Sequence, residues 1–419
     1  MGVFNVPQGI ALAAITGVNP VYGLYTAIFP SFIYIFFGTS KHNALGGFAV
    51  LSLMTAKAIE KVDQIWSAAN ATLAGTGTDE QEKGFMNVTE FLEMTNGTLL
   101  YDVSSNATSL LEDMAAAGPN SIAIATTLLF MAGVLQIIMG LLHLHYLACY
   151  FSEQVMSGFI VGGVVHVFFA QRVLDLIDRL DDIHIPTVII SASSIIFLIV
   201  SKVVVGITAT NFAELVSRHN IAVVGNMPTN FPPPALPRLE LSFTLFWEAL
   251  SIATAATAIH ITVAKFVEKR YEYHINYGQE LYAIGFVGVL SSFFPVFPVT
   301  SGFQRSVVGA AVGGSTQLTC LFSSMMLIGV IFYIGPVLEY LPKCVLASIM
   351  LVSLKNSFIK IRDLRVLWPT FKIDAIIFVA SMVLTICYDM VQGMMGAVIL
   401  AVGSLDGIFC RRMEVEATR

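Results

Sequence analysis

One charged residue stands alone in a long apolar part of the sequence. Residues 281–338 span 58 positions and contain a single charged side chain, Arg305. A lone charge at membrane depth costs about 2.5–3.5 kcal/mol on insertion scales, so it persists where it is paired, hydrated or useful. The preceding residues 294–302 contain two prolines and a glycine. Because these residues disfavour a helix, we expect a helix to begin near Gln304.

Irregular backbone followed by a helix start inside a membrane would form an anion-binding site. The free N–H groups and the positive dipole end of the helix would face the ligand, and Arg305 would add a full positive charge. The alternative is that Arg305 extends to the membrane interface as a topological anchor. A second irregular entry, Gly46-Gly47, precedes the apolar stretch 48–54. Two broken helices in corresponding halves of a chain indicate the binding site of a transporter.

The composition predicts a polytopic membrane protein. Of the 419 residues, 12% are charged and 56% are hydrophobic, whereas an average soluble domain has about 25% charged residues. This balance argues against a cytosolic enzyme, a nucleic-acid binder and a disordered chain, and it indicates a chain embedded in the lipid bilayer. The five cysteines lie in or beside apolar runs and do not indicate a disulfide framework.

Charge-free runs locate the membrane segments. Residues 9–40 carry no Asp, Glu, Lys or Arg, and Asn19-Pro20 divides them into two helices joined by a turn. Residues 42–56 are short for a full crossing and predict a half-helix. The Pro-rich segment 228–237 cannot be helical and is expected to be a linker on the outside. Further apolar runs lie at about 121–147, 155–170, 187–210, 244–264, 281–299, 316–336, 343–354, 372–388 and 391–408.

A polar region at residues 57–118 interrupts these runs. It contains four N-x-T sequons, at Asn70, Asn87, Asn96 and Asn106. Four sequons in one loop predict an extracellular glycosylated segment, although a loop rich in Thr and Asn could produce them by chance. Ten of the 28 acidic residues lie between positions 60 and 113, so the net charge of −6 is mostly local and says little about a substrate. With this loop outside, most Lys and Arg residues fall inside, as the positive-inside bias requires.

Several blocks of sequence carry a family resemblance. They include VPQG at 6–9, PVYGLY at 20–25, GTSKH at 38–42, GFAVLSLM at 47–54, VVGNMPT at 223–229, GQEL at 278–281, Arg305-Ser306 and GGSTQL at 313–318. The blocks run in order along nearly the whole chain. In them, the chain resembles the membrane domain of the SulP-type anion permeases, the family that includes prestin and pendrin.

The resemblance implies an all-α polytopic fold of the uracil-permease-like type, with fourteen segments in two inverted seven-segment repeats and with half-helices three and ten. It implies a core domain at 1–147 (segments 1–4) and 241–336 (segments 8–11). It implies a gate domain at 148–240 (segments 5–7, shortened) and 337–419 (segments 12–14). It also implies a multi-pass protein of the plasma membrane that forms a homodimer and takes no cofactor or metal. The cytoplasmic STAS domain of the family is not expected in this chain.

By the same resemblance, the anion sits between the N-termini of half-helices three and ten. Gln8 would donate a hydrogen bond, Phe48 would present a positive ring edge, and Arg305 would supply charge. Alternatively, Phe48 and Phe303 are core aromatic residues and Leu12 is a packing residue. The full set implied is Gln8, Leu12, Phe48, Ala49, Phe303, Gln304, Arg305 and Ser306.

Three departures from the family pattern bear on function. Gly47 stands where the family usually has proline, and Leu12 where some members have an aromatic residue. We therefore expect anion selectivity to differ from that of those members. Proton-coupled members carry a glutamate in the eighth segment, and this position is Ile259, with Glu248 only near the segment's start. This argues against proton symport. His260 is expected to be packed or hydrogen-bonded rather than a proton relay, and His166 likewise.

The third departure lies at residues 186–212, where only Ser201-Lys202 divides a region that is too short for two full crossings.

The leading hypothesis is an elevator-type transporter of sulfate, chloride, bicarbonate or oxalate that works by exchange, uniport or channel-like conduction. The alternative is a truncated, non-transporting isoform that associates with full-length subunits. A membrane enzyme is disfavoured because no Ser/His, paired-Asp or metal-ligand spacing is visible in the segments. A nucleobase symporter of the same fold is disfavoured because membrane carboxylates are absent at the positions where such proteins need them.

Overall fold

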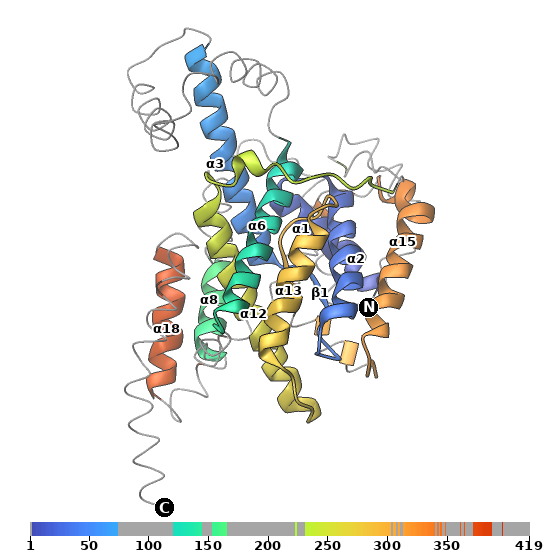
Figure 1. The fold of residues 1–419 in the computed structure, drawn as a ribbon, viewed down its shortest axis with the longest axis vertical. Helices are drawn as coiled ribbons and strands as arrows, with labels where there is room; N and C mark the ends of the chain where they lie inside the picture. Colours follow the sequence, from blue (N-terminus) through green and yellow to red (C-terminus); the bar gives the residue numbers. More distant parts are fainter. Residues whose placement is uncertain are drawn as a thin grey trace, which may run out of the picture.

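Helices make up most of the residues that the computed structural model of this protein describes (Figure 1). It describes residues 2–73, 120–144, 153–165, 231–302 and 372–387, most of 305–339, and a few single residues between and beyond these ranges. The described helices are α1 (Gly2–Thr16), α2 (Pro20–Phe37), α3 (Ala49–Leu73), α6 (Ser121–Leu141), α8 (Glu153–Val165), η3 (Leu239–Leu241), α12 (Phe246–Tyr271), α13 (Tyr277–Ser291), α15 (Leu318–Leu338) and α18 (Lys372–Cys387).

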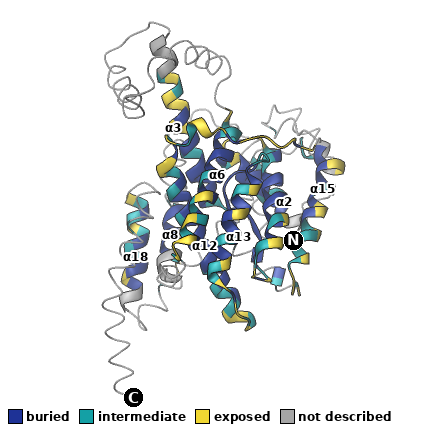
Figure 2. Cartoon of the chain, viewed as in Figure 1, coloured by how far each residue is buried: buried dark blue, intermediate teal, exposed yellow. Residues whose placement is uncertain are grey.

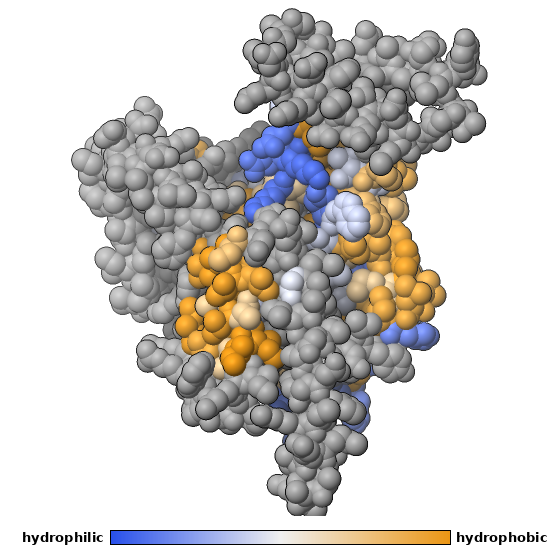
Figure 3. All heavy atoms as spheres, turned by 90° about the vertical axis from the view of Figure 1, so that its left-hand side faces the viewer, coloured by the Kyte–Doolittle hydropathy of each residue, from blue (hydrophilic) through white to orange (hydrophobic). Residues whose placement is uncertain are grey.

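The length and apolar character of these helices agree with a membrane protein. Among the described residues, α2, α6 and α12 are long and apolar enough to cross a membrane, and shorter apolar stretches lie in α15 and α18. Buried residues concentrate in the centre of the molecule, and exposed ones occur on the upper half of α3 and at the lower end of α12 (Figure 2). On the face shown in Figure 3, hydrophobic atoms form two areas at mid-height, and the largest group of hydrophilic atoms lies above them.

The turn between α1 and α2 forms where the sequence predicted it. The side chain of Asn19 accepts a hydrogen bond from the backbone N–H of Val21 at 3.1 Å, and Pro20 occupies the first position of α2. Two glycines then bring the helices into backbone contact, because a Cβ atom on Gly23 would lie 2.0 Å from the carbonyl oxygen of Gly9. Small residues at a crossing are the usual way for membrane helices to approach closely.

Two short strands depart from the all-α prediction. Strand β1 (Leu45–Gly47) pairs antiparallel with β2 (Val299–Ser301), and Leu45 lies opposite Ser301. They coincide with the irregular entries predicted at 46–47 and 294–302. Pairing satisfies their backbone groups, which could not remain unpaired inside a membrane. Each strand leads to a helix: α3 begins at Ala49, and Arg305 and Ser306 are helical.

Helix α3 is longer than the predicted half-helix at 42–56, and the polar loop therefore does not begin at residue 57. The helix continues to Leu73. Ala58, Ile59 and Val62 remain buried in its extension and continue the apolar stripe, while Lys61 forms an ion pair of 2.6 Å with Glu248 at the start of α12. The charged residues that ended the predicted span therefore belong to the exposed face of the same helix.

Some predictions fall outside the described residues. Asn70 lies in the last turns of α3, but Asn87, Asn96 and Asn106 are not described, so the sequons remain a prediction. The same holds for His166 and for the region 186–212.

The Pro-rich segment is non-helical over its described part, residues 231–238, as predicted, and it runs across one end of the helices (Figure 1). The ring of Phe231 packs edge-on against Phe29, with centroids 5.4 Å apart. Further along, the backbone N–H of Ala235 donates to the carbonyl oxygen of Phe293 at 2.7 Å, and that of Arg238 donates to Thr127 Oγ1 at 3.1 Å. These contacts fasten the segment to α2, to α6 and to the end of α13.

Candidate functional site

Arg305 lies at the junction of the two strand-to-helix entries. Its side chain is buried, with 4% of the residue exposed. Its Nη1 atom donates to the carbonyl oxygen of Leu45 at 2.8 Å, and its Nη2 atom lies 3.5 Å from both Gln8 Oε1 and the carbonyl oxygen of Gly47. The guanidinium is therefore held inside the protein, between α1 and β1, and does not extend to an interface as the anchor alternative required.

The two glycines of β1 make room for this arrangement. A Cβ atom on Gly46 would lie 1.7 Å from Arg305 Nη1, so any side chain there would displace the guanidinium. A Cβ atom on Gly47 would lie 3.0 Å from both Leu12 Cδ1 and Phe297 Cε2. The Gly46-Gly47 pair, which the sequence marked as an irregular entry, therefore allows β1 to pass close to Arg305 and to the core.

The structure brings six of the eight predicted site residues to this region. Gln8 turns its acceptor oxygen towards Arg305, and Ala49 begins α3. Leu12 is buried in the core cluster with Phe297, which favours the packing alternative, and Phe48 packs against the same cluster while remaining half-exposed. Ser306 Oγ accepts a hydrogen bond from the backbone N–H of Ala44 at 3.1 Å, so it holds the turn before β1. Phe303 and Gln304 lie outside the described residues.

A small polar cavity adjoins Arg305. Two buried atoms of the residues that line it have no hydrogen-bond partner within the described structure: Arg305 Nε, a donor, and Asn5 Oδ1, an acceptor. The amide nitrogen of Asn5 donates to Ser323 Oγ at 3.2 Å. The sequence did not predict this cavity; its one signal was the presence of Ser and Thr within the apolar start of α15. Its lining comprises Asn5, Ser31, Ala44, Arg305, Thr319, Cys320 and Ser323.

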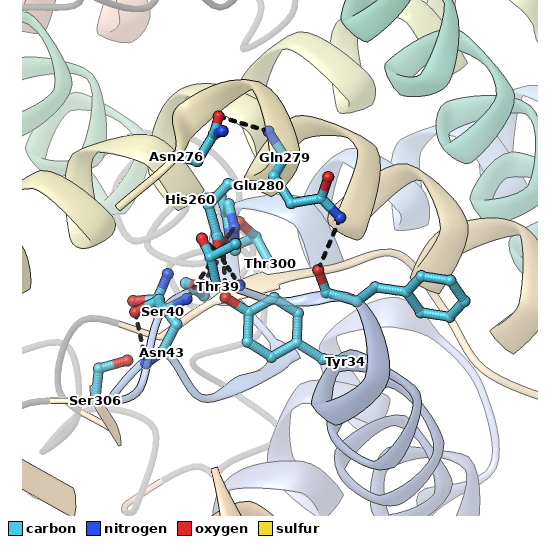
Figure 4. A network of polar contacts seen from close by, with 12 residues as sticks. Tyr34, Thr39, Ser40, Asn43, His260, Asn276, Gln279, Glu280, Thr300 and Ser306 are labelled. Atoms are coloured by element: carbon cyan, nitrogen blue, oxygen red, sulfur yellow. Dashed lines mark hydrogen bonds and ion pairs between the residues drawn. The ribbon is translucent and has the colours of Figure 1, made fainter. Parts of the chain in front are cut away.

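A second polar centre surrounds Glu280, a residue to which the sequence analysis gave no role (Figure 4). Its Oε1 atom accepts hydrogen bonds from the backbone N–H and hydroxyl of Thr39, both at 2.6 Å, and from the backbone N–H of Ser40 at 2.8 Å. Its Oε2 atom accepts from the Tyr34 hydroxyl at 2.6 Å and lies 2.7 Å from His260 Nε2. Five donors around one buried carboxyl group favour the ionised carboxylate.

His260 is hydrogen-bonded on both sides, as the sequence analysis expected. Its Nε2 atom contacts Glu280, and its Nδ1 atom lies 2.7 Å from Ser301 Oγ. The neighbouring Ile259 is buried in the core, and Glu248 lies at the start of α12, as predicted. A carboxylate reaches His260 from another helix, because Glu280 enters from α13.

Comparison with solved structures finds chains that share the helical fold of this protein. The solved structure described as the overall structure of SLC26A9 superposes with a TM-score of 0.75 at 21% sequence identity, covering 96% of this chain and 63% of that one. The similarity at this identity defines the fold. The fourteen-segment count is not established by it.

The sequence comparisons define the family. The model of the sulfate permease family matches residues 1–381, and the chain belongs to this family. It is 54% identical to sulfate permease family protein 3 of Caenorhabditis elegans, over 96% of this chain and 57% of that protein. It is 31% identical to prestin of Danio rerio, over 96% of this chain and 56% of that protein. The chain thus spans little more than half the length of these curated relatives. The resemblance found in the sequence motifs is confirmed.

Proposed function

We propose that this protein transports a small inorganic or organic anion across the plasma membrane. The observation that carries the proposal is the buried guanidinium of Arg305, whose partners among the described residues are neutral oxygen atoms. Two of these three contacts are long, and Nε has no partner in the described structure. A buried charge is expensive unless it is paired, so this site favours a ligand that carries negative charge.

The helix starts support the same ligand chemistry. The guanidinium of Arg305 reaches back along the strand pair to the carbonyl oxygen of Gly47, two residues before α3 begins at Ala49. Free N–H groups and the positive dipole ends of two helices would then face one region together with the guanidinium. We assign Gln8, Phe48, Ala49, Phe303, Gln304, Arg305 and Ser306 to this proposed anion site, and Leu12 to the core packing beside Gly47.

The proposed transport mode rests on two other residues, Glu280 and Ile259. Glu280 already accepts hydrogen bonds from five donors, and Ile259 is apolar, so neither provides a free proton carrier for symport. We therefore favour exchange or uniport of sulfate, chloride, bicarbonate or oxalate, without a cofactor. A core domain (1–147 and 241–336) would move as an elevator against a gate domain (148–240 and 337–419) within a homodimer of two 7+7 inverted-repeat chains.

The packing of two helices supports this division. Helices α8 and α18, which come from the two proposed gate segments, pack directly on each other (Figure 1). A Cβ atom on Gly158 would lie 2.5 Å from the carbonyl oxygen of Phe378, and one on Gly162 would lie 2.7 Å from that of Met382. Such close contact between helices distant in the sequence is expected within one rigid unit.

The test is uptake of labelled sulfate or chloride by proteoliposomes that contain the purified chain. We expect saturable uptake by the wild type and a loss of at least about tenfold in Arg305→Gln, because the buried charge that attracts the anion is removed. Arg270→Gln, at the exposed end of α12, is the matched control and should retain uptake. Equal uptake by wild type and Arg305→Gln would refute the role of Arg305, and absence of uptake by the wild type would favour the non-transporting alternative.

A further inference from the structure

Glu280 joins two structural connections that both end at the proposed anion site. The first runs through His260, which contacts Glu280 through Nε2 and Ser301 Oγ through Nδ1, each at 2.7 Å. Ser301 is the last residue of β2, and it lies opposite Leu45 of β1 in the strand pair. Four positions further along the chain is Arg305. The carboxylate of α13 is thus connected through α12 to the strand that precedes Arg305.

The second connection runs through the loop after α2. The Glu280 carboxylate accepts hydrogen bonds from the backbone N–H groups of Thr39 and Ser40, and these bonds fix the start of this loop. The Ser40 hydroxyl then accepts a hydrogen bond from the backbone N–H of Asn43 at 3.3 Å. The next residue, Ala44, donates a hydrogen bond from its backbone N–H to Ser306 Oγ. β1 follows directly. This connection therefore reaches the strand that precedes α3.

Both connections meet at one carbonyl group. The backbone oxygen of Leu45 accepts hydrogen bonds from Arg305 Nη1 and from Ser31 Oγ, both at 2.8 Å. We propose that Glu280 is the positioning residue of the anion site: its ionised carboxylate sets β1 relative to β2, and thereby sets Arg305 relative to the start of α3. This proposal rests on the proposed anion-binding function and adds a residue that contacts no ligand itself.

The order of carboxylate, imidazole and hydroxyl in Glu280, His260 and Ser301 is that of the catalytic chain of many hydrolases. All three residues are fully buried, and Ser301 lies inside a paired strand. A nucleophile must reach a substrate carbonyl, and this hydroxyl does not reach the surface. The same geometry serves here to fix the imidazole and the strand that it contacts.

The negative charge itself matters, and not only the shape of the side chain. A glutamine at position 280 would keep one acceptor oxygen and place an NH₂ group against donors on the other side. Either the Thr39 and Ser40 groups or the Tyr34 and His260 groups would then lose their acceptor. A buried donor that loses its acceptor costs free energy, so we expect the hydrogen bonds of one of the two connections to break.

The experiment uses the full chain and two readouts. Anion binding is measured as the increase in melting temperature of the purified protein with sulfate or chloride, and transport as KM and Vmax of labelled uptake in proteoliposomes. For Glu280→Gln we expect KM to rise about tenfold, and the anion-induced increase in melting temperature to require correspondingly more anion. Ser301→Ala removes a single hydroxyl group and should raise KM about threefold. Glu248→Gln, which alters the carboxylate paired with exposed Lys61, is the control and should leave both readouts unchanged.

The outcomes separate this inference from the proposed function. If both test variants keep the wild-type KM and anion dependence, the positioning role is refuted, even if melting temperature or yield falls. If Glu280→Gln does not fold, Ser301→Ala decides alone. If the wild type shows anion-induced stabilisation but no uptake, the transport function fails, while the positioning role is still tested by the binding readout. If the wild type shows neither effect, both proposals fall.

Discussion

Arg305 and Leu45 are 260 positions apart in the sequence, yet Arg305 Nη1 donates a 2.8 Å hydrogen bond to the carbonyl oxygen of Leu45. This bond connects the helix that follows β2 with the strand that precedes α3. It depends on Gly46, the next residue, because the guanidinium passes over its α-carbon. The position of the buried charge is therefore set by the backbone of a distant strand.

This relationship predicts the effect of Gly46→Ala. The added Cβ atom would lie 1.7 Å from Arg305 Nη1, so either the guanidinium or β1 must move. We expect anion uptake to fall at least about tenfold while the protein still folds, because overpacking of one methyl group costs about 1–3 kcal/mol. Gly329→Ala is the control, since no heavy atom lies within 4 Å of a Cβ atom there. Wild-type uptake by Gly46→Ala would contradict this account of Arg305.

The helices and the buried arginine could be predicted from the sequence because their signals are local. The turn at Asn19-Pro20 follows from helix capping, and Arg305 is conspicuous because nothing else in residues 281–338 is charged. The extension of α3 was missed because its charges ended the apolar run, although Ala58, Ile59 and Val62 continued the helical spacing. When membrane helices are located by charge-free runs, the part of a helix that continues beyond the membrane is overlooked.

The polar centres could not be predicted because their contacts are long-range. Glu280 at the start of α13 resembles an ordinary acidic residue in a first helical turn, and its partners Tyr34 and Thr39 precede it by more than 240 positions. The pairing of β1 with β2 likewise joins two three-residue segments of no strand-like pattern. Only the three-dimensional arrangement shows that Glu280, His260 and Ser301 lead to the proposed site.

The loop after α2 predicts a pH dependence of stability. His42 stacks on Tyr271 with ring centroids 4.4 Å apart, and its Nδ1 atom lies 3.2 Å from the Tyr273 hydroxyl. Burial, and then the nearby Lys41, lower the pKa of His42 from its usual 6.5. The unfolded chain then binds more protons than the folded protein at pH values below about 6.5, so stability falls as the pH falls through this range.

His42→Gln should remove part of this acid sensitivity, because glutamine does not titrate. The measurement is the melting temperature of the purified protein between about pH 7.5 and 5.5. His274→Gln provides the control, since it replaces a histidine whose side chain is fully exposed. An unchanged slope of melting temperature against pH in His42→Gln would show that other groups account for the acid sensitivity.

The cavity beside Arg305 allows a direct test of whether the guanidinium holds the anion. Asn5 and Arg305 both line it, and each has one buried atom without a partner in the described structure. Asn5→Asp changes the volume very little but places a carboxylate in this cavity, where it can pair with the guanidinium and replace the anion as its counter-charge. We expect uptake to fall at least about tenfold, with KM raised rather than Vmax alone lowered.

Two controls make this prediction specific. Asn120→Asp introduces the same charge at the exposed residue before α6 and should leave uptake unchanged. In the double variant Asn5→Asp with Arg305→Gln, the new carboxylate has no guanidinium to pair with, so the two effects should not add. If Asn5→Asp retained the wild-type KM, the guanidinium would not be the group that holds the anion, and the proposed site would have to lie elsewhere in the core.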